Sequence, residues 1–461
     1  MIRHTDSVGT EKYIDLVRRL DPAEQKRAFV MTFGCQQNEA DSEKLRGMAE
    51  AMGYVEADSP EDADLIVMNT CAIREHAEMK ALSTLGGFKV LKRKNPRLIV
   101  GVVGCMAAEP GVVERLKCDF HYVSFTLEPN MLHRFPEAVY TSLTDGKRKF
   151  ILGEDEGDLV EGMPTVRRDK HRAWVSVMYG CNNFCSYCIV PYVRGRERSR
   201  CSSDVLSECR ELIADGVKEI TLLGQNVNSY RSDMDFPELL AAIAAIPGDF
   251  IIRFMTSHPK DTSDKLISTL GEHKERIAPY FHLPLQSGSD AILRRMNRTY
   301  TREHFLGIVD KLRAAVPGIA LSTDVIVGFP GESEDDFEDT LDVLRRARFD
   351  LVYAFLYSER QGTRAADFEC KIPKQTKDER LSRLLTIQDE ISAGASLPYR
   401  DTVQRVLVDS SERRDGTTVY TGRTPSNKPV HFTAPKASIG DFVSVRIERA
   451  TPFTLYGRAA E

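Results

Sequence analysis

Short apolar runs alternate with segments of helical periodicity along the first 150 residues of the chain. Between the runs, Leu45, Met48 and Met52 recur at the spacing of one helix face. Strands that alternate with helices predict a parallel sheet. We therefore expect an α/β domain over residues 27–150, preceded by a polar, mainly helical extension over residues 1–26. The three predicted strands are residues 28–33, 65–69 and 98–103.

A cysteine follows each of these three predicted strands. Cys35, Cys71 and Cys105 stand at the same place in three repeated units, at intervals of 36 and 34 residues. The carboxyl ends of parallel strands share one edge of a sheet, where sites gather, so the three thiols can converge on a metal. The alternative is that each thiol simply packs as a small hydrophobic side chain.

A second series of strands and helices follows a polar segment at residues 153–172. Helical segments such as 203–215 and 301–315 separate six apolar runs. Six repeats are fewer than the eight of a complete (β/α) barrel, so residues 151–396 are expected to form a partial, open (β/α)6 barrel. The six predicted strands are residues 174–178, 219–223, 251–255, 281–285, 319–326 and 351–355.

The last segment, residues 397–461, has the pattern of a small β domain. Five short alternating runs in about 60 residues predict an OB-like β-barrel. From residue 398 onward, ten Lys and Arg against seven Asp and Glu give a net charge of +3, whereas the whole chain carries -5. The five predicted strands are residues 403–408, 417–420, 429–433, 442–448 and 454–457.

A cysteine-rich loop follows the first predicted strand of the central barrel. Its spacing, CxxxCxxC, brings Cys181, Cys185 and Cys188 onto one short loop. Soft thiolates select iron–sulfur clusters, zinc or copper(I). A cubane cluster normally takes four cysteines, so three ligands from one loop leave one iron open. Zinc sites usually use paired CxxC or Cys/His sets, and no such pair follows here, so we expect a cluster rather than zinc or buried thiols.

Each predicted barrel strand delivers polar residues or glycines at its carboxyl end, where the sites of barrel enzymes lie. Several of them on one rim predict a ligand cavity, whereas any single one is explained equally well as an ordinary turn. His258 lies on the same rim, and we expect it to form a hydrogen bond at a strand end. The candidate ligand-binding residues are Tyr187, Gly224, Gln225, Ser257, Gln286, Ser287 and Asp324.

Two basic segments are candidates for contact with phosphate. Four arginines fall within residues 194–200, which predicts phosphate contacts through Arg194 and Arg196; a solvated loop is the alternative. A predicted hairpin of the last domain combines positive charge with a ring that can stack on a base, which predicts an RNA face, with a structural wedge as the alternative. The candidates on this hairpin are Arg423, Asn427, Lys428 and Phe432.

Composition indicates the cellular compartment in which the protein works. Of 461 residues, 42% are hydrophobic and 28% are charged, and no apolar run of about 18 residues predicts a membrane span. Residues 1–27 are charged and lack the apolar core of a secretory signal. Ten cysteines without a dense disulfide pattern favour a reducing compartment. We expect a cytoplasmic monomer that has no membrane partner.

The CxxxCxxC loop, with Tyr187 before its last cysteine, resembles that of radical S-adenosylmethionine (SAM) enzymes. TFGCQQNEADS, NTCAIREHAEMK and GVVGCMA resemble the amino-terminal domain of radical SAM methylthiotransferases, and GRTPSNKPVHF resembles a TRAM domain, a small RNA-binding module. The resemblance implies two [4Fe–4S] clusters, an auxiliary one held by Cys35, Cys71 and Cys105 and a SAM-binding one held by the CxxxCxxC loop. It also implies that the rim residues bind SAM, with Tyr187 stacked on adenine.

The motifs CQQNEADS, LLGQNVNSY and HLPLQSGSD resemble one subgroup of that family. This implies conversion of N6-isopentenyl-adenosine at position 37 of a tRNA anticodon stem-loop to its 2-methylthio form. One SAM would donate the methyl group and another the radical, and an electron donor and a sulfur source would be required. Gln37 and Ala40 depart from the usual motif. Alternatives are methylthiolation of threonylcarbamoyl-adenosine or of ribosomal protein S12, or a non-catalytic RNA-binding iron–sulfur protein.

Overall fold

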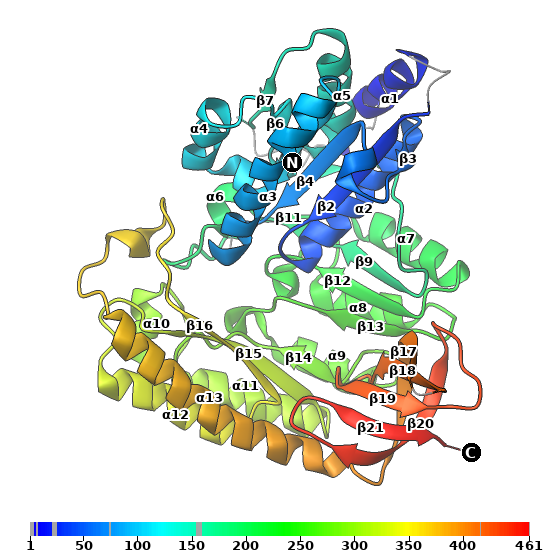
Figure 1. The fold of residues 1–461 in the computed structure, drawn as a ribbon. Coiled ribbons are helices and arrows are strands. Elements are labelled where there is room, and N and C mark those ends of the chain that lie inside the picture. The colour runs from blue at the N-terminus through cyan, green and yellow to red at the C-terminus, as the bar shows by residue number, and fades with distance from the viewer. Residues whose placement is uncertain are drawn as a thin grey trace. The chain divides into compact units, whose positions relative to one another are not determined.

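The computed structural model describes residues 4–5, 8–20, 25–72, 75–153, 159–414 and 416–460. Figure 1 shows its helices and strands. The chain divides into two compact units. Ile73 and Arg74 of the NTCAIREHAEMK motif, and part of the expected linker, lie outside the described residues. The first unit comprises residues 1–168, 178–182 and 188–200, and the second comprises 169–177, 183–187 and 201–461.

A six-stranded, fully parallel sheet forms the centre of the first unit, in the order β3-β2-β4-β5-β6-β7. Every residue of β4 and β5 is buried, as expected for parallel strands that are covered on both faces. The three strands predicted from the sequence are confirmed as β2, β4 and β5. The strands are β2 (Arg27–Thr32), β3 (Val55–Glu56), β4 (Leu65–Thr70), β5 (Ile99–Gly104), β6 (Phe125–Leu127) and β7 (Lys149–Ile151).

Helices cover the two faces of this sheet and create two hydrophobic cores. Leu45 and Phe135 belong to one core, and Leu85 and Leu116 to the other. The expected helical extension is α1, and its residue Ile14 is buried in the first core, so α1 is part of this unit rather than a solvated arm. The helices are α1 (Val8–Leu20), α2 (Gln36–Ala51), α3 (Glu75–Lys94), α4 (Pro110–Cys118), α5 (Phe135–Thr144) and α6 (Val190–Arg194).

Short elements complete the first unit. Two parallel strands, β1 and β8, pair with each other, and two antiparallel strands, β10 and β11, flank the CxxxCxxC loop along the chain. These elements are β1 (His4–Thr5), η1 (Pro60–Asp62), η2 (Cys105–Ala108), η3 (Pro129–Arg134), β8 (Leu159–Val160), β10 (Met178–Tyr179) and β11 (Arg198–Ser199).

Six parallel strands form the central part of the second unit, which confirms the six predicted from the sequence. They pair as two three-stranded sheets, β13-β12-β9 and β14-β15-β16, joined by a bridge between Ile252 and Ile277. The strands are β9 (Arg172–Ser176), β12 (Glu219–Leu223), β13 (Ile251–Phe254), β14 (Tyr280–His282), β15 (Ala320–Val327) and β16 (Leu351–Leu356).

Helices follow these strands in sequence, as a partial (β/α)6 barrel requires. No helix in the described part of the chain is long and apolar enough to cross a membrane. The helices are α7 (Ser202–Ala214), α8 (Phe236–Ala244), α9 (Asp264–Glu272), α10 (Asp290–Arg295), α11 (Arg302–Ala315), α12 (Glu334–Ala347) and α13 (Lys374–Ser396), with the short η4 (Val227–Ser229), η5 (Pro259–Asp261), η6 (Arg364–Asp367) and η7 (Leu397–Tyr399).

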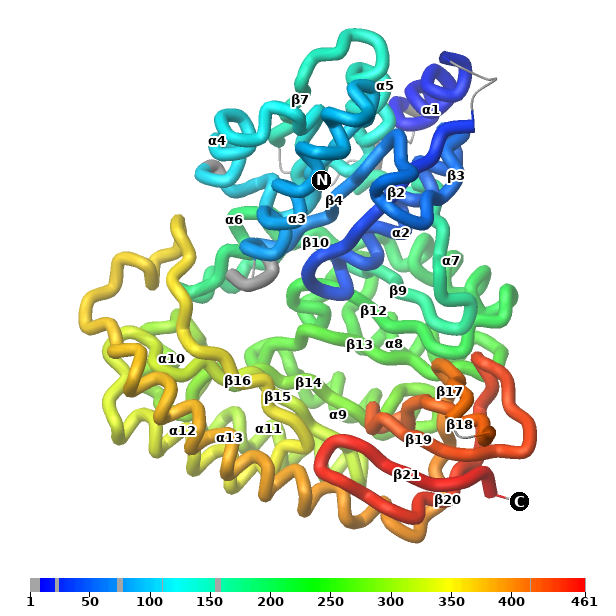
Figure 2. The backbone as a smooth tube through the Cα atoms, viewed as in Figure 1, coloured from blue at the N-terminus to red at the C-terminus, as the bar shows by residue number. Residues whose placement is uncertain are grey.

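The carboxyl-terminal part of the second unit is a closed barrel in the order β17-β18-β19-β21-β20 (Figure 2). Val406, Tyr420, Phe432 and Leu455 are among the residues that fill its core. The five predicted strands are confirmed, and the first continues six residues further than expected. They are β17 (Val403–Arg414), β18 (Thr417–Arg423), β19 (Pro429–Thr433), β20 (Phe442–Ala450) and β21 (Leu455–Ala459).

The turn between β18 and β19 joins the closed barrel to the central strands of the same unit. Arg253 on β13 is buried, and its guanidinium donates to the carbonyl oxygens of Thr424 at 2.9 Å and Pro425 at 2.7 Å. The same guanidinium forms a buried ion pair with Glu219 at 2.7 Å. Lys428 Nζ lies 3.2 Å from Asp350 Oδ1. This turn is therefore a structural joint within the second unit.

Replacement of Arg253 by Met should destabilise this joint. The change leaves the Glu219 carboxylate buried without its cation and removes two donors, and breaking a buried pair in this way typically costs about 3–5 kcal/mol. Arg423→Met is the matched control, because Arg423 is half-exposed and pairs with Asp409 at 3.6 Å, an interaction worth about 0–1 kcal/mol. Urea denaturation followed by circular dichroism measures both. Equal losses of unfolding free energy in the two variants would contradict the buried joint.

Candidate metal centres

Cys35, Cys71 and Cys105 gather at the carboxyl edge of the parallel sheet in the first unit. Thr70, which precedes Cys71, pairs in register with Gly104, which precedes Cys105. Cys71 and Cys105 are buried, and Cys35 is partly exposed. The three thiols are near enough that Cys71 and Cys35 both raise the pKa of Cys105. The convergence expected from the repeated strand–cysteine pattern is thus present in the fold.

Two glycines bring these cysteines together. Gly34 has φ +120°, and a Cβ there would lie 2.5 Å from the Cβ and 3.0 Å from the Sγ of Cys71. Gly104 has φ +93°, and a Cβ there would lie 2.5 Å from Asn69 Oδ1 and from the carbonyl oxygen of Thr70. Any larger residue would force the neighbouring strand away and would also be strained at positive φ. The glycines therefore allow the turns after β2 and β5 to approach β4.

Asn38 locks the same turns by hydrogen bonds. Its Nδ2 donates to the carbonyl oxygens of Phe33 at 2.8 Å and Thr70 at 2.9 Å, so one side chain connects the ends of β2 and β4. Asn69 Nδ2 donates in return to the carbonyl oxygen of Asn38 at 2.7 Å. Asn38 and Asn69 are both completely buried. The sequence reasoning did not identify either residue as part of the site, although both belong to the motifs that carry the cysteines.

Arg194 is buried beside the three cysteines. It is 2% exposed, and its Nε lies 3.1 Å from Cys105 Sγ. Its Nη2 donates to Asn38 Oδ1 at 2.7 Å and to Asp41 Oδ2 at 3.1 Å. This corrects the expectation that Arg194 contacts phosphate, because a buried guanidinium with these partners is not presented to RNA. No local pattern around Arg194 indicates this placement, since its partners come from α2 and η2.

The protonation state of Cys105 bears on metal binding. Burial raises the pKa of the Cys105 thiol to about 12, against the opposing effect of Arg194. Cys105 is thus a neutral thiol at physiological pH until a metal displaces its proton. Within the described residues, no group of three His, Cys, Asp or Glu side chains is arranged around a single ion. A cubane binds each thiolate through a different iron, so three spaced thiols fit a cluster better than one ion.

The CxxxCxxC loop is divided between the two units: Cys181 and Cys188 belong to the first, and Cys185 belongs to the second. In the first unit, Cys181 is buried and its N–H donates to the carbonyl oxygen of Gly195 at 3.1 Å. Ile189, next to Cys188, packs with Val193 against Cys105. The segment that follows Cys188 is therefore anchored on the edge that carries the other cysteine triplet.

In the second unit, Cys185 is buried and receives a hydrogen bond from Arg298. Arg298 is 7% exposed; its Nη1 lies 3.5 Å from Cys185 Sγ, while Nη2 donates to the carbonyl oxygen of Pro284 at 2.7 Å. Its Nε donates to the hydroxyl of Tyr300 at 2.9 Å. Burial lowers the pKa of Arg298, but Tyr300, Tyr187 and Cys185 outweigh it, so the pKa is raised and the group stays charged.

Two buried oxygens at strand ends of the second unit fit the binding of a polar ligand. Ser257 Oγ follows β13 and Asn226 Oδ1 follows β12, and neither has a hydrogen-bond partner in the described part of the chain. Gly224 is buried and Gln225 is half-buried on the same turn as Asn226. Such unsatisfied groups are costly unless a ligand meets them. The amino, carboxylate and ribose groups of SAM supply matching donors and acceptors.

The other expected ligand-binding residues have partners within the second unit. Gln286 is buried with φ +68°, and its backbone bridges to β15. Ser287 Oγ accepts from the N–H of Ser289 at 3.2 Å, which is a structural contact. Asp324 Oδ2 lies 3.4 Å from His282 Nε2 and is partly exposed. Tyr187 packs in a hydrophobic cluster that includes Phe329 and Tyr357.

His258 forms a hydrogen bond at a strand end, as expected. Its Nδ1 accepts from the N–H of Lys260 at 3.2 Å, and its backbone N–H donates to Asn228 Oδ1 at 2.9 Å. Burial, with Arg298 and Lys260 nearby, lowers the pKa of His258 to about 2. The imidazole is therefore neutral throughout the physiological pH range and has a structural role.

Most of the arginines at residues 194–200, which were expected to contact phosphate, are buried. Arg198 donates to Asn130 Oδ1 at 2.6 Å, and Arg200 forms two hydrogen bonds of 2.7 Å with Glu161. Both are buried, whereas Arg196 is exposed. Of the four arginines in this segment, Arg196 alone keeps the surface position that contact with RNA requires.

The hairpin expected to bind RNA also differs from the expectation. Phe432 is 1% exposed and stacks on Tyr420 inside the closed barrel, and Lys428 is 6% exposed. Asn427 is half-buried and Arg423 is exposed. The structure therefore corrects the RNA-binding expectation for Lys428 and Phe432, because a core ring and a paired ammonium are not available to a base or phosphate.

A different basic face of the closed barrel was missed by the sequence reasoning. Arg446 on β20 and Arg458 on β21 are directly opposed and exposed. Arg449 lies over the ring of Tyr456 at 3.8 Å, and that ring is 5.6 Å from His431. Like charges directly opposite each other destabilise a sheet. Glu448, whose Oε1 lies 3.0 Å from Arg458 Nε, offsets part of this repulsion. The alternation of arginines with buried residues in β20 was the available signal.

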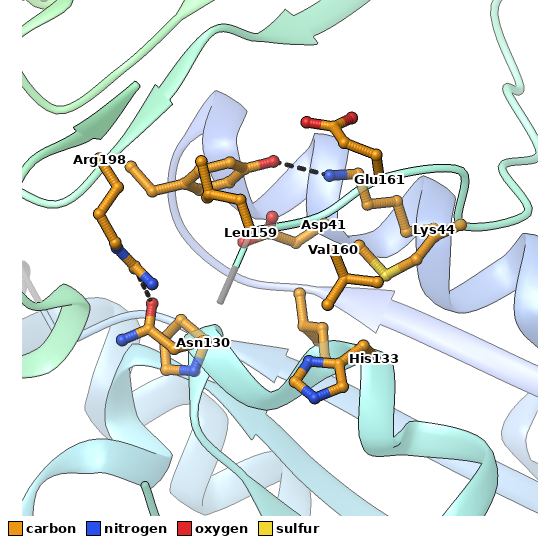
Figure 3. A pocket seen from close by; sticks show the side chains of 12 residues that line it. Asp41, Lys44, Asn130, His133, Leu159, Val160, Glu161 and Arg198 are labelled. Atoms are coloured by element: carbon orange, nitrogen blue, oxygen red, sulfur yellow. Dashed lines mark hydrogen bonds between the residues drawn. The ribbon is translucent and has the colours of Figure 1, made fainter. Parts of the chain in front are cut away.

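Two cavities in the described part of the first unit are not lined by the cysteines. Figure 3 shows one of them, bordered by Lys44, Asn130 and Arg198. Its volume of about 40 Å³ has room for water but not for a cofactor. Lys44 Nζ donates to the hydroxyl of Tyr179 at 2.8 Å there. Burial lowers the pKa of Lys44, but Tyr179 and Asp41 outweigh it, so the ammonium stays charged. The other cavity, of about 670 Å³, lies at the amino ends of the strands.

Comparisons with family models match three segments of the chain. They are "Uncharacterized protein family UPF0004" over residues 27–127, "Radical SAM superfamily" over residues 175–344 and "TRAM domain" over residues 399–460. The three segments follow the order of the sheet domain, the partial barrel and the closed barrel. The fold of each part thus agrees with the one expected from the sequence.

Similar proteins extend over nearly the whole chain. The tRNA-2-methylthio-N6-dimethylallyladenosine synthase of Caldicellulosiruptor saccharolyticus is 48% identical over 94% of this chain and 92% of its own length. The protein of the same name from Alkaliphilus oremlandii is 45% identical over 98% of this chain and 97% of its own length. Among solved structures, the radical S-adenosylmethionine methyltransferase TsrM from Kitasatospora setae, with cobalamin and a [4Fe–4S] cluster bound, has a TM-score of 0.54 at 14% identity, covering 74% of this chain and 77% of that one. This last likeness concerns the fold alone.

Reconstitution with iron and sulfide should load two clusters per chain. Two separate cysteine triplets predict about eight irons, from four per cubane. Replacing Cys181, Cys185 and Cys188 by Ala should leave about half of that iron, because the triplet at the sheet edge of the first unit is unchanged. Iron and acid-labile sulfide analysis measures both proteins. A wild-type protein that holds only four irons would exclude the second cluster.

Proposed function

The chain belongs to the tRNA-2-methylthio-N6-dimethylallyladenosine synthase family of radical SAM methylthiotransferases, and we propose that it converts N6-isopentenyl-adenosine at position 37 of tRNA to the 2-methylthio form. The observation that carries this proposal is the presence of two thiol triplets in one chain. One lies at the carboxyl edge of a parallel sheet, and the other lies on the loop after the first strand of a partial barrel. A protein with a single triplet could cleave SAM but would lack a second place to hold sulfur.

The cofactors of this enzyme family are two [4Fe–4S] clusters and SAM. When bound, they supply the one-electron chemistry, the sulfur and the methyl group that the reaction needs. The chain supplies their placement: Cys181, Cys185 and Cys188 hold the SAM-binding cluster, and the triplet at the sheet edge holds the auxiliary one. Burial of most of these thiols keeps water away from reactive species, which is the main contribution of a protein to cofactor chemistry.

Residues at the strand ends of the second unit position SAM in this proposal. The unsatisfied oxygens of Ser257 and Asn226 support contacts to its amino acid and ribose groups. Tyr187, which immediately precedes Cys188, supports packing against adenine. Asp324 is partly exposed and accepts hydrogen bonds, which supports a further polar contact. Gly224 and Gln225 contribute a close backbone approach beside Asn226.

The identity of the modified base follows from the relatives. Proteins named for dimethylallyladenosine match this chain at 45–48% identity, which favours isopentenyl-adenosine over threonylcarbamoyl-adenosine or ribosomal protein S12. The reaction also requires an electron donor and a sulfur source from outside the chain. We place the enzyme in the cytoplasm as a monomer, where reduced thiols and tRNA are both available.

The closed barrel contributes to tRNA binding through the face of β20 and β21. Arg446 and Arg458 are directly opposed and exposed, with Glu448 3.0 Å from Arg458, and the neighbouring pair of the two strands is Arg449 and Tyr456, whose ring lies under the Arg449 guanidinium. Phosphate contacts by arginine, combined with stacking rings, are the usual basis of single-strand RNA binding. Arg196 and Arg423 are also exposed, and Arg423 keeps its contact with Asp409 at 3.6 Å.

Simultaneous replacement of Arg446 and Arg458 by Ala should weaken tRNA binding and reduce its salt dependence. Each phosphate contact that is lost lowers the slope of log Kd against log salt by about one, so the double variant should lose about two. Arg346→Ala is the matched control, because this exposed arginine, paired with Glu303, lies on α12 and not on the closed barrel. Fluorescence anisotropy over a salt series measures the slopes. An unchanged slope in the double variant would rule out this face.

Removal of one cysteine ligand from each thiol triplet should abolish a different part of the activity. Cys185→Ala should abolish formation of 5′-deoxyadenosine, because SAM loses both its chelating iron and its electron source. Cys71→Ala should leave SAM cleavage intact but yield no methylthiolated tRNA, because the place that holds the sulfur is lost. Anaerobic turnover with dithionite, with both products measured in the same reaction, tests this division.

One outcome would overturn the proposed division of labour. If Cys71→Ala protein, with its auxiliary cluster verified as absent, still made one methylthio product per chain, the sulfur would not depend on the first unit. The intact protein must also act on tRNA that carries isopentenyl-adenosine and leave unmodified adenosine unchanged. Equal activity on the two tRNAs would contradict the assigned substrate.

A further inference from the structure

Each cysteine triplet has one thiol that is contacted by a buried arginine. In the first unit, Arg194 Nε lies 3.1 Å from Cys105 Sγ, and in the second unit, Arg298 Nη1 lies 3.5 Å from Cys185 Sγ. The two arginines are 2% and 7% exposed. Arginine is almost never fully buried unless it is paired. Two such residues, each directed at a sulfur that is expected to bind iron, therefore indicate a common role.

The remaining contacts of each guanidinium fix its direction. Arg194 is held by Asn38 at 2.7 Å and by Asp41 at 3.1 Å, and both partners lie on α2 directly after Cys35. Arg298 is held by the carbonyl oxygen of Pro284 at 2.7 Å and by the hydroxyl of Tyr300 at 2.9 Å. Both partners of Arg194 accept from its Nη2, whereas the partners of Arg298 accept from Nη2 and Nε, and in each case a planar guanidinium held in this way has little freedom to turn away. The N–H group that faces sulfur is thus held in place by the others.

A hydrogen bond of this kind becomes stronger once iron is bound. A thiol that coordinates a metal is deprotonated, so the acceptor changes from a neutral sulfur to a thiolate. A hydrogen bond between a charged donor and a charged acceptor is roughly twice as strong as a neutral one. Reduction of a cluster adds negative charge to its sulfurs, and a cationic donor favours the reduced form. Hydrogen bonds to the sulfurs are one of the features that set cluster potentials.

We propose that Arg194 and Arg298 are positioning residues that each donate to one cluster thiolate and raise the reduction potential of that cluster alone. Arg194 serves the auxiliary cluster at Cys105, and Arg298 serves the SAM-binding cluster at Cys185. The proposal rests on the proposed function, because it takes the two clusters as given. Arg194, which the sequence analysis predicted to contact phosphate, thus acts on the reduction potential of the auxiliary cluster.

The surroundings of the two arginines predict different magnitudes. Arg194 shares its charge with the Asp41 carboxylate, whereas the other two contacts of Arg298 are with neutral oxygens. Removing Arg298 should therefore shift its cluster more than removing Arg194 shifts the other. Asp41→Asn removes a negative charge next to Arg194 and should move the auxiliary potential in the opposite direction.

Redox titration monitored by electron paramagnetic resonance tests the proposal on reconstituted full-length protein. Arg194→Met should lower the midpoint potential of the auxiliary cluster and leave that of the SAM-binding cluster unchanged. Arg298→Met should lower the midpoint potential of the SAM-binding cluster and leave that of the auxiliary cluster unchanged. Each variant is therefore the matched control of the other. Asp41→Asn should raise the auxiliary midpoint. The auxiliary signal is isolated in the background that lacks the three cysteines of the CxxxCxxC loop.

Unchanged midpoints in variants that hold the full iron content would overturn the proposal. A wild-type protein with only four irons would instead overturn the proposed function, so the two failures are distinguishable. If Arg194→Met loses auxiliary iron, Arg194→Lys decides, because lysine keeps the cation but not the geometry of the fork. A lowered midpoint with iron retained in Arg194→Lys supports a directed hydrogen bond. A wild-type midpoint, or loss of iron, in Arg194→Lys shows that only charge balance or packing matters.

Discussion

The structure of the first unit depends on bringing three thiols together at one edge of a parallel sheet. Parallel register makes β2, β4 and β5 end at the same edge of the sheet. The cysteine that follows each strand is therefore brought to that edge. Close approach then requires that no side chain stands between the turns, which Gly34 and Gly104 provide. Asn38 supplies the donors that satisfy the carbonyl groups at those turns. The parallel register, the two glycines and Asn38 thus all contribute to the close approach of the three thiols.

Burial of the thiols makes their ionisation costly, and a nearby cation offsets this cost. A buried thiol resists ionisation, as the raised pKa of Cys105 shows, and cluster binding demands three thiolates in a small volume. A cation placed in contact with the sulfur reduces the free energy cost of that charge. In both units this cation is an arginine rather than a lysine. Its planar, permanently charged fork can donate to sulfur and to oxygen partners at the same time.

The sequence predicted the strands and the cysteines well because both are local patterns. Apolar runs of strand length, each followed by a cysteine, are visible without any knowledge of contacts. The burial of Arg194 was not predictable in this way, since its partners Asn38 and Asp41 lie more than 150 positions away. Phe432 is a different case, because Phe432 and Val430 are both buried and are separated by the partly exposed His431 in β19, and that period of two was a signal for burial.

The positive charges of the chain therefore fall into two classes that sequence alone does not separate. Arg194, Arg253 and Lys428 are buried and neutralised by carboxylates, so their charge stabilises the structure and leaves nothing for a polyanion. Arg446 and Arg458 are exposed and face each other across a strand pair, and Glu448, 3.0 Å from Arg458 Nε, balances part of their charge while both guanidinium groups stay at the surface. A hairpin rich in basic residues is consequently weaker evidence for RNA binding than a pair of like charges that the fold leaves opposed.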